Sequence, residues 1–375
     1  MTEKSTVGIG MIGHAFMGKT HSIGYRDIPV IAPLDVPRPR LKAIYGRDTA
    51  RLEEARERYG WERAVSDWRE IIDDPDIQLV DNVGPNSIHV EPIIAAARAG
   101  KHVYCEKPLA PDAGQSFEMW KVAHEAGVKH MCAFNYRFFP ALQLARQMIH
   151  DGELGDIYHF RSNFLVSSSL SESRVKGWRD DKSLAGSGAL GDLGSHHIDI
   201  SRFLLSSDPV RATAVTGVAV GKAGDEQRIE TDDLFAALLS YENGALGVLE
   251  ASRVAGGNMV TSRIEVDGSR GSIRFSMQNL NELEFAGTDK AWRRINVLRD
   301  GDPYQKNWLP PGHPLGWVDT FSHEAMHMLA AIGGLGEIAP VGATFRDGYY
   351  CAEIVDAIVR SAAEGASANI TYRTL

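Results

Sequence analysis

Two segments of the sequence carry side chains that suit acid–base chemistry. Asp192 and His196 lie four residues apart where a helix is expected to begin, so both side chains should lie on one helical face. A carboxylate in that place can orient an imidazole, a common general base. Lys107 follows a short apolar run, and its ammonium group is a compact cation that can stabilise negative charge developing on oxygen. Taken alone, each feature has a plain alternative: a surface pair for Asp192 and His196, and a solvated loop residue for Lys107.

Glycines near the N-terminus predict a dinucleotide-binding loop in one of two registers. The pattern G-x-G-x-x-G is matched in full from Gly8, and from Gly13 it is matched with Ala15 in the middle position. Only the second register follows a complete apolar strand and opens a helix, which is the context this motif requires. The helix N-terminus would hold the phosphates; the alternative is a strand turn that binds nothing. The loop residues in this register are Gly13, His14, Ala15, Phe16, Met17 and Gly18.

The end of the next predicted strand bears on which dinucleotide binds. Leu41–Tyr45 is followed by Gly46 and Arg47, where an acidic residue that binds the ribose hydroxyls of NAD is expected. A small residue followed by arginine suits the 2′-phosphate of NADP. The sequence therefore predicts NAD or NADP, with a slight preference for NADP. The alternative is that Arg47 is a solvated loop residue and Asp48 caps a helix.

The first third of the chain has the alternating pattern of a parallel, doubly wound sheet. Its β-rich runs are Thr6–Ile12, Leu41–Tyr45, Leu79–Val83, His102–Cys105 and Lys129–Phe134. Its helical patterns include Thr49–Tyr59, Pro92–Ala99 and Ala113–Ala126. The stretch Ile28–Arg40 holds four prolines and is predicted to be a surface loop, because proline disrupts helices and central strands.

After about Phe134 the pattern changes to successive strands separated by turns. The strand-like segments are Ile157–Val166, Val210–Val220, Ile229–Tyr241, Ala245–Ala251, Arg263–Val266 and Ser272–Phe275. Helices are expected at Ser195–Leu205, Asp319–Ile332 and Phe345–Glu364. The predicted fold is α/β: an N-terminal Rossmann dinucleotide-binding domain over residues 1–134, then an α+β domain over residues 135–375 with a large, mostly antiparallel open sheet.

Composition excludes several classes of protein. The 375 residues are 43% hydrophobic and 24% charged, as in ordinary globular chains. A net charge of −9 argues against nucleic acid or an anionic membrane as partner, and no apolar run is long enough to span a bilayer. Three cysteines without C-x-x-C spacing suit a reducing cytoplasm, and the first residues do not have the pattern of a signal peptide. We expect a cytoplasmic protein.

The segment Cys105-Glu106-Lys107-Pro108-Leu109, after the fourth predicted strand, resembles the Glu-Lys-Pro segment of the Gfo/Idh/MocA oxidoreductases. Three further segments extend the resemblance over nearly the whole chain. Residues 84–89 resemble the family's cofactor-side loop, residues 99–103 its approach to Glu-Lys-Pro, and residues 186–196 its catalytic segment in the second domain. The chain is therefore similar to dehydrogenases that move a hydride between a nicotinamide and a substrate hydroxyl.

The resemblance implies roles for particular residues. Lys107, Asp192 and His196 would be the catalytic set, with His196 as base, Lys107 as stabiliser of the alkoxide and Asp192 as orienter of the imidazole. The peptide after Lys107 would be cis. The residues implied on the cofactor side are Asn86, His89, Glu106, Trp178 and Arg179, and the substrate-pocket candidates are Tyr136 and His313. The resemblance also implies a homodimer or homotetramer, with the open sheet as the contact surface.

Several segments are most similar to levoglucosan dehydrogenases and related glycoside 3-dehydrogenases. They are residues 15–22, the proline-rich stretch, residues 134–137 and residues 312–317. The substrate implied is a ring hydroxyl, at C3, of a sugar or glycoside such as an anhydrosugar. An inositol (cyclitol) dehydrogenase is the alternative within the family.

Parts of the sequence also fit two hypotheses from other classes of protein. His323, Glu324 and His327 fit H-E-x-x-H, the zinc-peptidase helix, but the match lacks the third histidine of one large subclass. An apolar stripe on the same helix explains it without a metal, so no metal site is predicted. A regulator that binds the cofactor without catalysis is the other reading, and the intact catalytic set argues against it.

Overall fold

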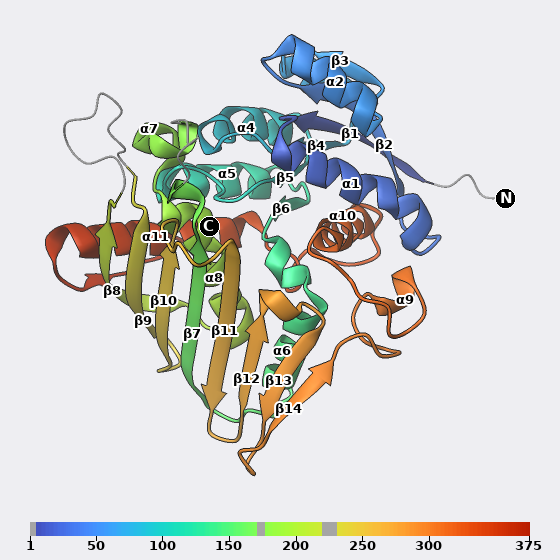
Figure 1. Cartoon of the computed structure of the whole chain (residues 1–375). Helices are drawn as coiled ribbons and strands as arrows, with labels where there is room; N and C mark the ends of the chain where they lie inside the picture. The colour runs from blue at the N-terminus through green and yellow to red at the C-terminus, as the bar shows by residue number, and fades with distance from the viewer. Residues whose placement is uncertain (1–4, 171–176, 220–230) are drawn as a thin grey trace.

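The computed structural model describes residues 5–170, 177–219 and 231–375. It contains two β-sheets, one built from the N-terminal third of the chain and one from most of the remainder (Figure 1). The predicted strand segments at 210–220 and 229–241 fall partly outside the described residues.

The first sheet is parallel and has the strand order β3-β2-β1-β4-β5-β6. Its strands are β1 (Thr6–Ile12), β2 (Arg38–Tyr45), β3 (Arg63–Val65), β4 (Leu79–Asn82), β5 (His102–Cys105) and β6 (His130–Cys132). Its helices are α1 (Phe16–Ile31), α2 (Thr49–Tyr59), α3 (Arg69–Asp73), α4 (Val90–Arg98) and α5 (Ala113–Glu125). The order reverses between β1 and β4, and ligands of such sheets bind in the crevice outside the strand ends at that point.

The second sheet has nine strands in the order β14-β13-β12-β11-β7-β10-β9-β8-β15. Among the strands that the structure describes, only β7 and β10 are parallel neighbours, so the sheet is mostly antiparallel, as predicted. The strands are β7 (Ile157–Val166), β8 (Pro209–Gly217), β9 (Leu234–Tyr241), β10 (Leu246–Ser252), β11 (Val260–Gly268), β12 (Ser272–Ser276), β13 (Glu282–Ala286), β14 (Trp292–Asn296) and β15 (Ala368–Asn369).

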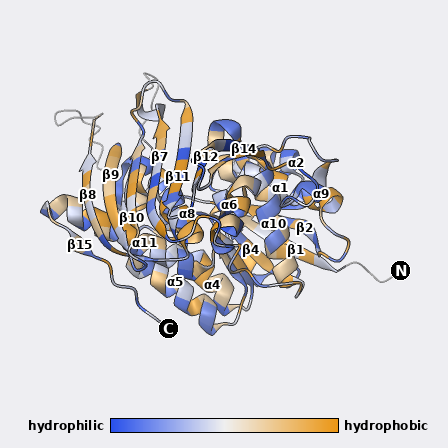
Figure 2. Cartoon of the chain, turned by 90° about the horizontal axis from the view of Figure 1, so that it is seen from below, coloured by the Kyte–Doolittle hydropathy of each residue, from blue (hydrophilic) through white to orange (hydrophobic). Residues whose placement is uncertain are grey.

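Helices cover one face of this second sheet, namely α6 (Pro140–His150), α8 (Ser195–Leu205) and α11 (Phe345–Glu364). The strands alternate buried and exposed residues, which is the pattern of a sheet with one covered face. Figure 2 shows hydrophobic and hydrophilic residues interleaved along these strands. Within the described residues, the other face carries no helix (Figure 1).

The chain returns to the first domain near its C-terminus. Helix α10 (Asp319–Ile332) packs against α1, and its buried Ala325, Met328 and Leu329 belong to the same apolar core as β1. Short helices α7 (Lys182–Ala185) and α9 (Gln305–Trp308) lie in connections. The predicted domain boundary at residue 134 stays a prediction. Residues after 318 also contact the N-terminal domain, so one cut in the sequence does not separate all contacts of the two domains.

The proline-rich stretch Ile28–Arg40 is not one surface loop, so that prediction was wrong. Helix α1 continues through Pro29 to Ile31, and β2 begins at Arg38. Pro29 lacks the N–H that would donate to the carbonyl four residues earlier, yet the helix continues past it to the buried Ile31. The Arg38 guanidinium donates to the Ile28 carbonyl at 2.8 Å and so satisfies the end of the helix.

No helix among the residues described is both long and apolar enough to cross a membrane.

Candidate active site

The Glu-Lys-Pro loop leaves the carboxyl end of β5 and reaches the second domain. The backbone N–H of Glu106 donates to the Asn82 carbonyl at 2.8 Å, which joins the ends of β4 and β5. The Lys107–Pro108 peptide is cis, as the resemblance implied. Lys107 Nζ donates to the Asp192 carbonyl oxygen at 2.6 Å and lies 3.5 Å from Asp192 Oδ1. The structure thus brings together two residues that are 85 positions apart in sequence.

The carboxylate of Asp192 is surrounded by cations. Asp192 lies in a π-helical turn over Leu190–Gly194, and Arg253 Nη2 donates to its Oδ2 at 2.9 Å. Arg179 Nε is 3.7 Å from Oδ1. Burial acts to raise the pKa of Asp192, but Lys107 and the two arginines outweigh it and hold this pKa well below its usual value. The group therefore stays ionised at neutral pH.

Sequence reasoning missed Arg253, which directly follows β10. Its side chain is 6% exposed and directed at Asp192. An arginine is rarely buried without a charged partner. The one signal in the sequence was therefore an arginine directly after a strand in which buried and exposed residues alternate. Nothing in the sequence around it showed which carboxylate it would meet.

His196 is the second residue of helix α8, one turn beyond Asp192. Its imidazole stacks on the ring of Tyr136, with ring centroids 4.2 Å apart and an angle of 17°. Burial and then Lys107 hold the pKa of His196 well below 6.5, so the imidazole is neutral and can accept a proton. In the described structure no hydrogen bond joins the Asp192 carboxylate to this ring, so Tyr136 orients the ring by stacking.

Aromatic residues from both domains line the approach to this set. Tyr136 lies in a short 3-10 helix over Asn135–Phe138, and its hydroxyl donates to the Met277 sulfur at 3.3 Å. Phe16, at the start of α1, stacks on Trp317 with ring centroids 6.1 Å apart. His313 is exposed, its Nδ1 donates to the Pro310 carbonyl at 2.7 Å, and no described contact joins it to the catalytic set.

The phosphate loop has the register that starts at Gly13. Strand β1 ends at Ile12, Gly13 has a φ of +112°, and α1 begins at Phe16. A Cβ on Gly18 would lie 2.7 Å from the Gly13 carbonyl oxygen, so the helix packs tightly on the turn. In α1 as described, Ala15 provides no side-chain cap and the first turn has no acidic residue. The first N–H groups of the helix are therefore free for a pyrophosphate, so the loop fits a dinucleotide.

The end of β2, where an acidic residue that binds the ribose of NAD was expected, has no room for an acidic side chain at position 46. A Cβ on Gly46 would lie 2.1 Å from His14 Nδ1, so the imidazole occupies the place of a side chain at position 46. Arg47 is exposed at the strand end. The Asp48 carboxylate accepts from the Arg51 N–H at 3.1 Å and caps α2, which confirms that part of the alternative weighed for this segment.

The remaining cofactor-side candidates lie in and around the loops that follow β4 and β5 or next to Asp192. Asn86 donates to the Ala185 carbonyl at 3.0 Å, and the fully buried His89 lies between the Gly84 carbonyl and that of Pro108. His89 thus joins the loop after β4 to the Glu-Lys-Pro loop. Glu106 is buried within the Glu-Lys-Pro loop. Trp178 and Arg179 lie in a 3-10 turn next to Asp192.

The two histidines of the H-E-x-x-H segment bond to groups other than a metal. His323 Nδ1 donates to the Phe138 carbonyl at 3.1 Å, and its Nε2 accepts from Trp308 Nε1 at 2.8 Å. His327 Nε2 donates to the Ile338 carbonyl at 2.8 Å. Across residues 5–170, 177–219 and 231–375, no group of three or more His, Cys, Asp or Glu side chains could hold a metal ion.

Comparison with known families decides the relationship. Residues 7–134 match the family described as "Oxidoreductase family, NAD-binding Rossmann fold", and residues 142–274 match the "GFO/IDH/MocA C-terminal domain". The chain belongs to the Gfo/Idh/MocA oxidoreductases. Its place is among the NAD-dependent sugar dehydrogenases of that family, so the predicted family and fold class are confirmed.

Individual relatives match over nearly the full length. Levoglucosan dehydrogenase of Pseudarthrobacter phenanthrenivorans is 38% identical, covering 96% of this chain and 96% of its own. Inositol 2-dehydrogenase of Rhizobium meliloti is 29% identical over 96% of this chain and 98% of its own. A solved structure of levoglucosan dehydrogenase in complex with NADH and levoglucosan is similar with a TM-score of 0.93 at 36% identity, covering 98% of this chain and all of that one.

Proposed function

We propose that the protein is an NAD-dependent dehydrogenase that oxidises a ring hydroxyl, at C3, of a sugar or glycoside such as an anhydrosugar. The observation that carries this proposal is the contact of Lys107 with Asp192 across the two domains, beside the neutral imidazole of His196. This set lies where the carboxyl ends of β4 and β5 meet the dinucleotide crevice. The similar levoglucosan dehydrogenase supports the choice of an anhydrosugar.

The catalytic set supplies what oxidation of a secondary alcohol requires. His196 takes the hydroxyl proton, since its lowered pKa keeps it neutral. Lys107 stabilises the alkoxide as the proton leaves, and the ionised Asp192 holds the Lys107 ammonium in place. Bound NAD would accept the hydride that leaves the same carbon, so the substrate becomes a ketone. Tyr136 fixes the plane of the His196 ring.

The cofactor in this proposal is NAD, held by the Gly13–Gly18 loop. Three of the similar structures are levoglucosan dehydrogenases in complex with NADH, so the slight preference for NADP gains no support from them. Arg47 remains a residue that could bind a 2′-phosphate, and equal affinity of the wild type for NAD and NADP would remove that assignment. Cofactor titrations followed by fluorescence would measure both affinities.

An inositol dehydrogenase is the second candidate, because the Rhizobium relative is similar over almost all of both chains. Both candidate functions would use the same Lys107, Asp192 and His196 of this chain, so the geometry of these residues does not separate the two functions. A screen of anhydrosugars, glycosides and cyclitols for NADH formation would do so. Turnover of levoglucosan-type substrates well above that of inositols supports the first proposal, and the reverse ranking replaces it with the second.

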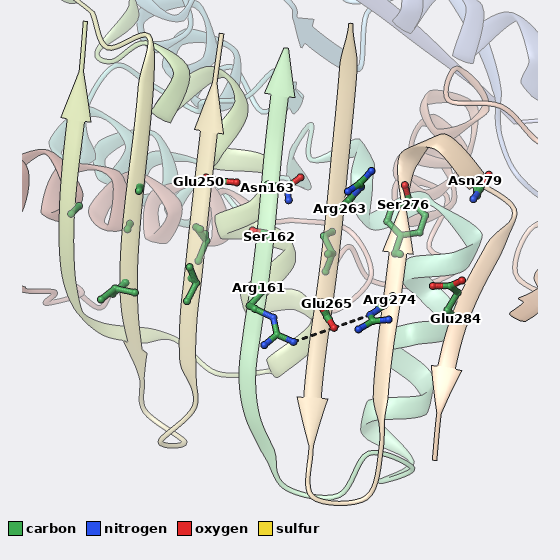
Figure 3. Close-up of a pocket in the computed structure, with 18 of the residues that line it drawn as sticks. Arg161, Ser162, Asn163, Glu250, Arg263, Glu265, Arg274, Ser276, Asn279 and Glu284 are labelled. Atoms are coloured by element: carbon green, nitrogen blue, oxygen red, sulfur yellow. Dashed lines mark hydrogen bonds and ion pairs between the residues drawn. The ribbon is translucent and has the colours of Figure 1, made fainter. Parts of the chain in front are cut away.

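The open face of the nine-stranded sheet supports a homodimer or homotetramer. It exposes apolar side chains on neighbouring strands, among them Val215, Leu238 and Val248. A hollow on this face is crossed by Arg161, Glu265 and Arg274 from three adjacent strands, with ion pairs of 3.1 and 2.8 Å (Figure 3). An exposed apolar patch with a charged row suits association with a second copy.

A cytoplasmic location is also part of the proposal. Cys105, Cys132 and Cys351 are all buried and free, which suits a reducing compartment.

A further inference from the structure

A buried histidine lies behind the Glu-Lys-Pro loop and takes no part in the proton transfer proposed above. His21, on α1, is 2% exposed. Its Nδ1 is 2.9 Å from Asp81 Oδ2 on β4, and its Nε2 is 3.1 Å from Glu106 Oε1 after β5. An imidazole can donate to two carboxylates at once only when both its nitrogens carry protons. His21 is therefore an imidazolium clamped between two buried anions.

The groups that face His21 from neighbouring elements add no further charge at neutral pH. From α1, the Tyr25 hydroxyl donates to Asp81 Oδ2 at 2.9 Å, and from β5 the Tyr104 ring stacks on the imidazole at 4.9 Å between centroids. Burial raises the pKa of both tyrosines and of Glu324, on α10, well above their usual values. Burial thus disfavours the charged form of all three, which leaves His21, Asp81 and Glu106 as the charged groups of the cluster.

The same electrostatics keep His21 charged over a wide pH range. Burial acts to lower the pKa of His21, but Asp81 and Glu106 outweigh it and raise this pKa to about 10. The imidazolium is thus present at neutral pH and is lost only in strongly alkaline solution.

Glu106 connects this cluster to the catalytic lysine. While its Oε1 faces His21, its Oε2 accepts from the backbone N–H of Lys107 at 2.9 Å. The ammonium group of Lys107 then reaches Asp192 in the second domain. A displacement of the Glu106 carboxylate would therefore move the backbone from which Lys107 projects.

We propose that His21 is a positioning residue: it holds the Glu106 carboxylate against the Lys107 backbone, and with Asp81 and Glu106 it places one net negative charge beside the cofactor crevice. This inference rests on the proposed function for the reaction that it serves. A net negative charge favours the oxidised nicotinamide, which is a cation, over the reduced one, which is neutral. The cluster thus biases the protein toward the cofactor form needed for alcohol oxidation.

Removal of the positioning group gives the first test. In His21→Gln a single amide replaces the two-sided imidazolium, so one carboxylate loses its donor. We expect kcat to fall about tenfold or more, with the KM for sugar within about threefold of wild type. The matched control is His323→Gln, another buried histidine, bonded to Trp308 and Phe138 instead of Glu106. A kcat of His21→Gln no lower than that of the control would overturn the positioning role.

Removal of one anion gives the second test, which needs no sugar. In Asp81→Asn the cluster changes from one net negative charge to none, so the affinity for NAD⁺ relative to NADH should fall about three- to tenfold. The loss of one of two anions also lowers the pKa of His21, so the alkaline limit of kcat should move to lower pH. An unchanged affinity ratio would overturn the charge bias. If His21→Gln does not fold, the alkaline limit of kcat in Asp81→Asn tests the positioning role in its place, and an unmoved limit would overturn that role.

The two proposals can fail separately. A protein that oxidises none of the sugars or cyclitols but shows the shifted cofactor ratio in Asp81→Asn would overturn the proposed substrate and support the charged cluster. If the protein oxidises sugars but Asp81→Asn leaves the ratio of NAD⁺ to NADH affinity unchanged, the proposed substrate is supported and the charge bias is overturned.

Discussion

Lys107 and His196 are expected to act on the same hydroxyl proton, one as a nearby cation and one as the base. Lys107→Met and His196→Ala should each lower kcat by about a hundredfold or more, because each removes stabilisation that is needed only as the proton leaves. The double variant should lose much less than the product of the two effects, since either change alone already disables the pair. Steady-state kinetics measure all three.

Cofactor affinity is the control for this pair. In the proposed site the Gly13–Gly18 loop binds the phosphates, so we expect NADH fluorescence titrations of His196→Ala to give an affinity close to wild type. A His196→Ala enzyme with near-normal kcat would place the base elsewhere, and Tyr136 would be the next candidate because its ring lies against His196.

The lowered pKa of His196 predicts where activity fails in acid. His196 works as a base only when neutral, so activity is lost as pH falls through its pKa in the folded protein, and that pKa is well below 6.5. We expect kcat/KM for sugar oxidation to stay level down to pH values below 6.5. In Lys107→Met one cause of the lowering is removed, so the acid limit of the residual activity should move to higher pH.

Lys129→Met is the matched control for this shift. Lys129 is a partly exposed lysine paired with Glu337, away from the catalytic set. Its removal should leave the acid limit where it is in wild type. An acid limit that is equal in Lys107→Met and in wild type would show that burial alone sets the pKa of His196.

At the scale of elements, the loops after β1 and β2 fit each other closely. Because a Cβ at position 46 would collide with the His14 ring, Gly46→Ala should force that ring aside and weaken NADH binding several-fold. His14→Ala combined with Gly46→Ala should relieve the collision, so the double variant should bind NADH better than Gly46→Ala. Fluorescence titration compares the three variants, and equal affinity of Gly46→Ala and wild type would contradict this account.

Helix α10 carries the H-E-x-x-H segment, and we expect it to work without zinc. Its first histidine holds Phe138 and Trp308, and its second holds the Ile338 carbonyl. Dehydrogenase activity should therefore survive exhaustive chelation, and metal analysis should find no stoichiometric zinc. Loss of turnover on chelation, restored by zinc, would show that the H-E-x-x-H segment does bind a metal needed for activity.

Local sequence patterns predicted most helices and strands. In these elements the spacing of apolar residues and the residues typical of element ends indicate the same boundaries. The range Asp319–Ile332 was predicted for α10 from its apolar stripe, and Phe345–Glu364 for α11, which ends at a glycine with left-handed φ. Short edge strands were missed: β14 is mostly exposed, and β15 has two residues, so neither carries an alternation that can be read. Pro29 misled the boundary of α1, because a proline usually ends a helix at the preceding residue, whereas α1 continues to Ile31.

The candidate site was predictable where a motif fixed it and not where tertiary contacts did. The Glu-Lys-Pro segment placed Lys107 at a strand end, and Asp192 and His196 were close in sequence. Arg253 and the stacking of Tyr136 on His196 depend on the packing of β10 and of residues 135–138 around α8, which no local pattern encodes. The clamp on His21 likewise joins three elements that are distant in sequence.

At the scale of the whole molecule, the site exists only because the two domains are held together. Lys107 comes from the first domain and Asp192 from the second, while α10 returns to pack on α1. The stacked Phe16 and Trp317 form another contact between the phosphate loop and the C-terminal part. The crevice is thus bounded by both halves, and its shape depends on their relative position.

The nine-stranded sheet leaves one face open, on the opposite side from α6, α8 and α11, so association through this face would leave the contacts of these helices unchanged (Figure 1). We expect light scattering to give a mass of two or four times 41.1 kDa. Leu238, 58% exposed on β9, would be buried in such a contact, so Leu238→Glu should shift the mass toward that of a monomer by placing a charge in an apolar interface. Val30→Glu is the matched control, because Val30 is 86% exposed on α1, outside this face. A wild type that is monomeric, or a Leu238→Glu variant with unchanged mass, would show that the open face is not the contact surface.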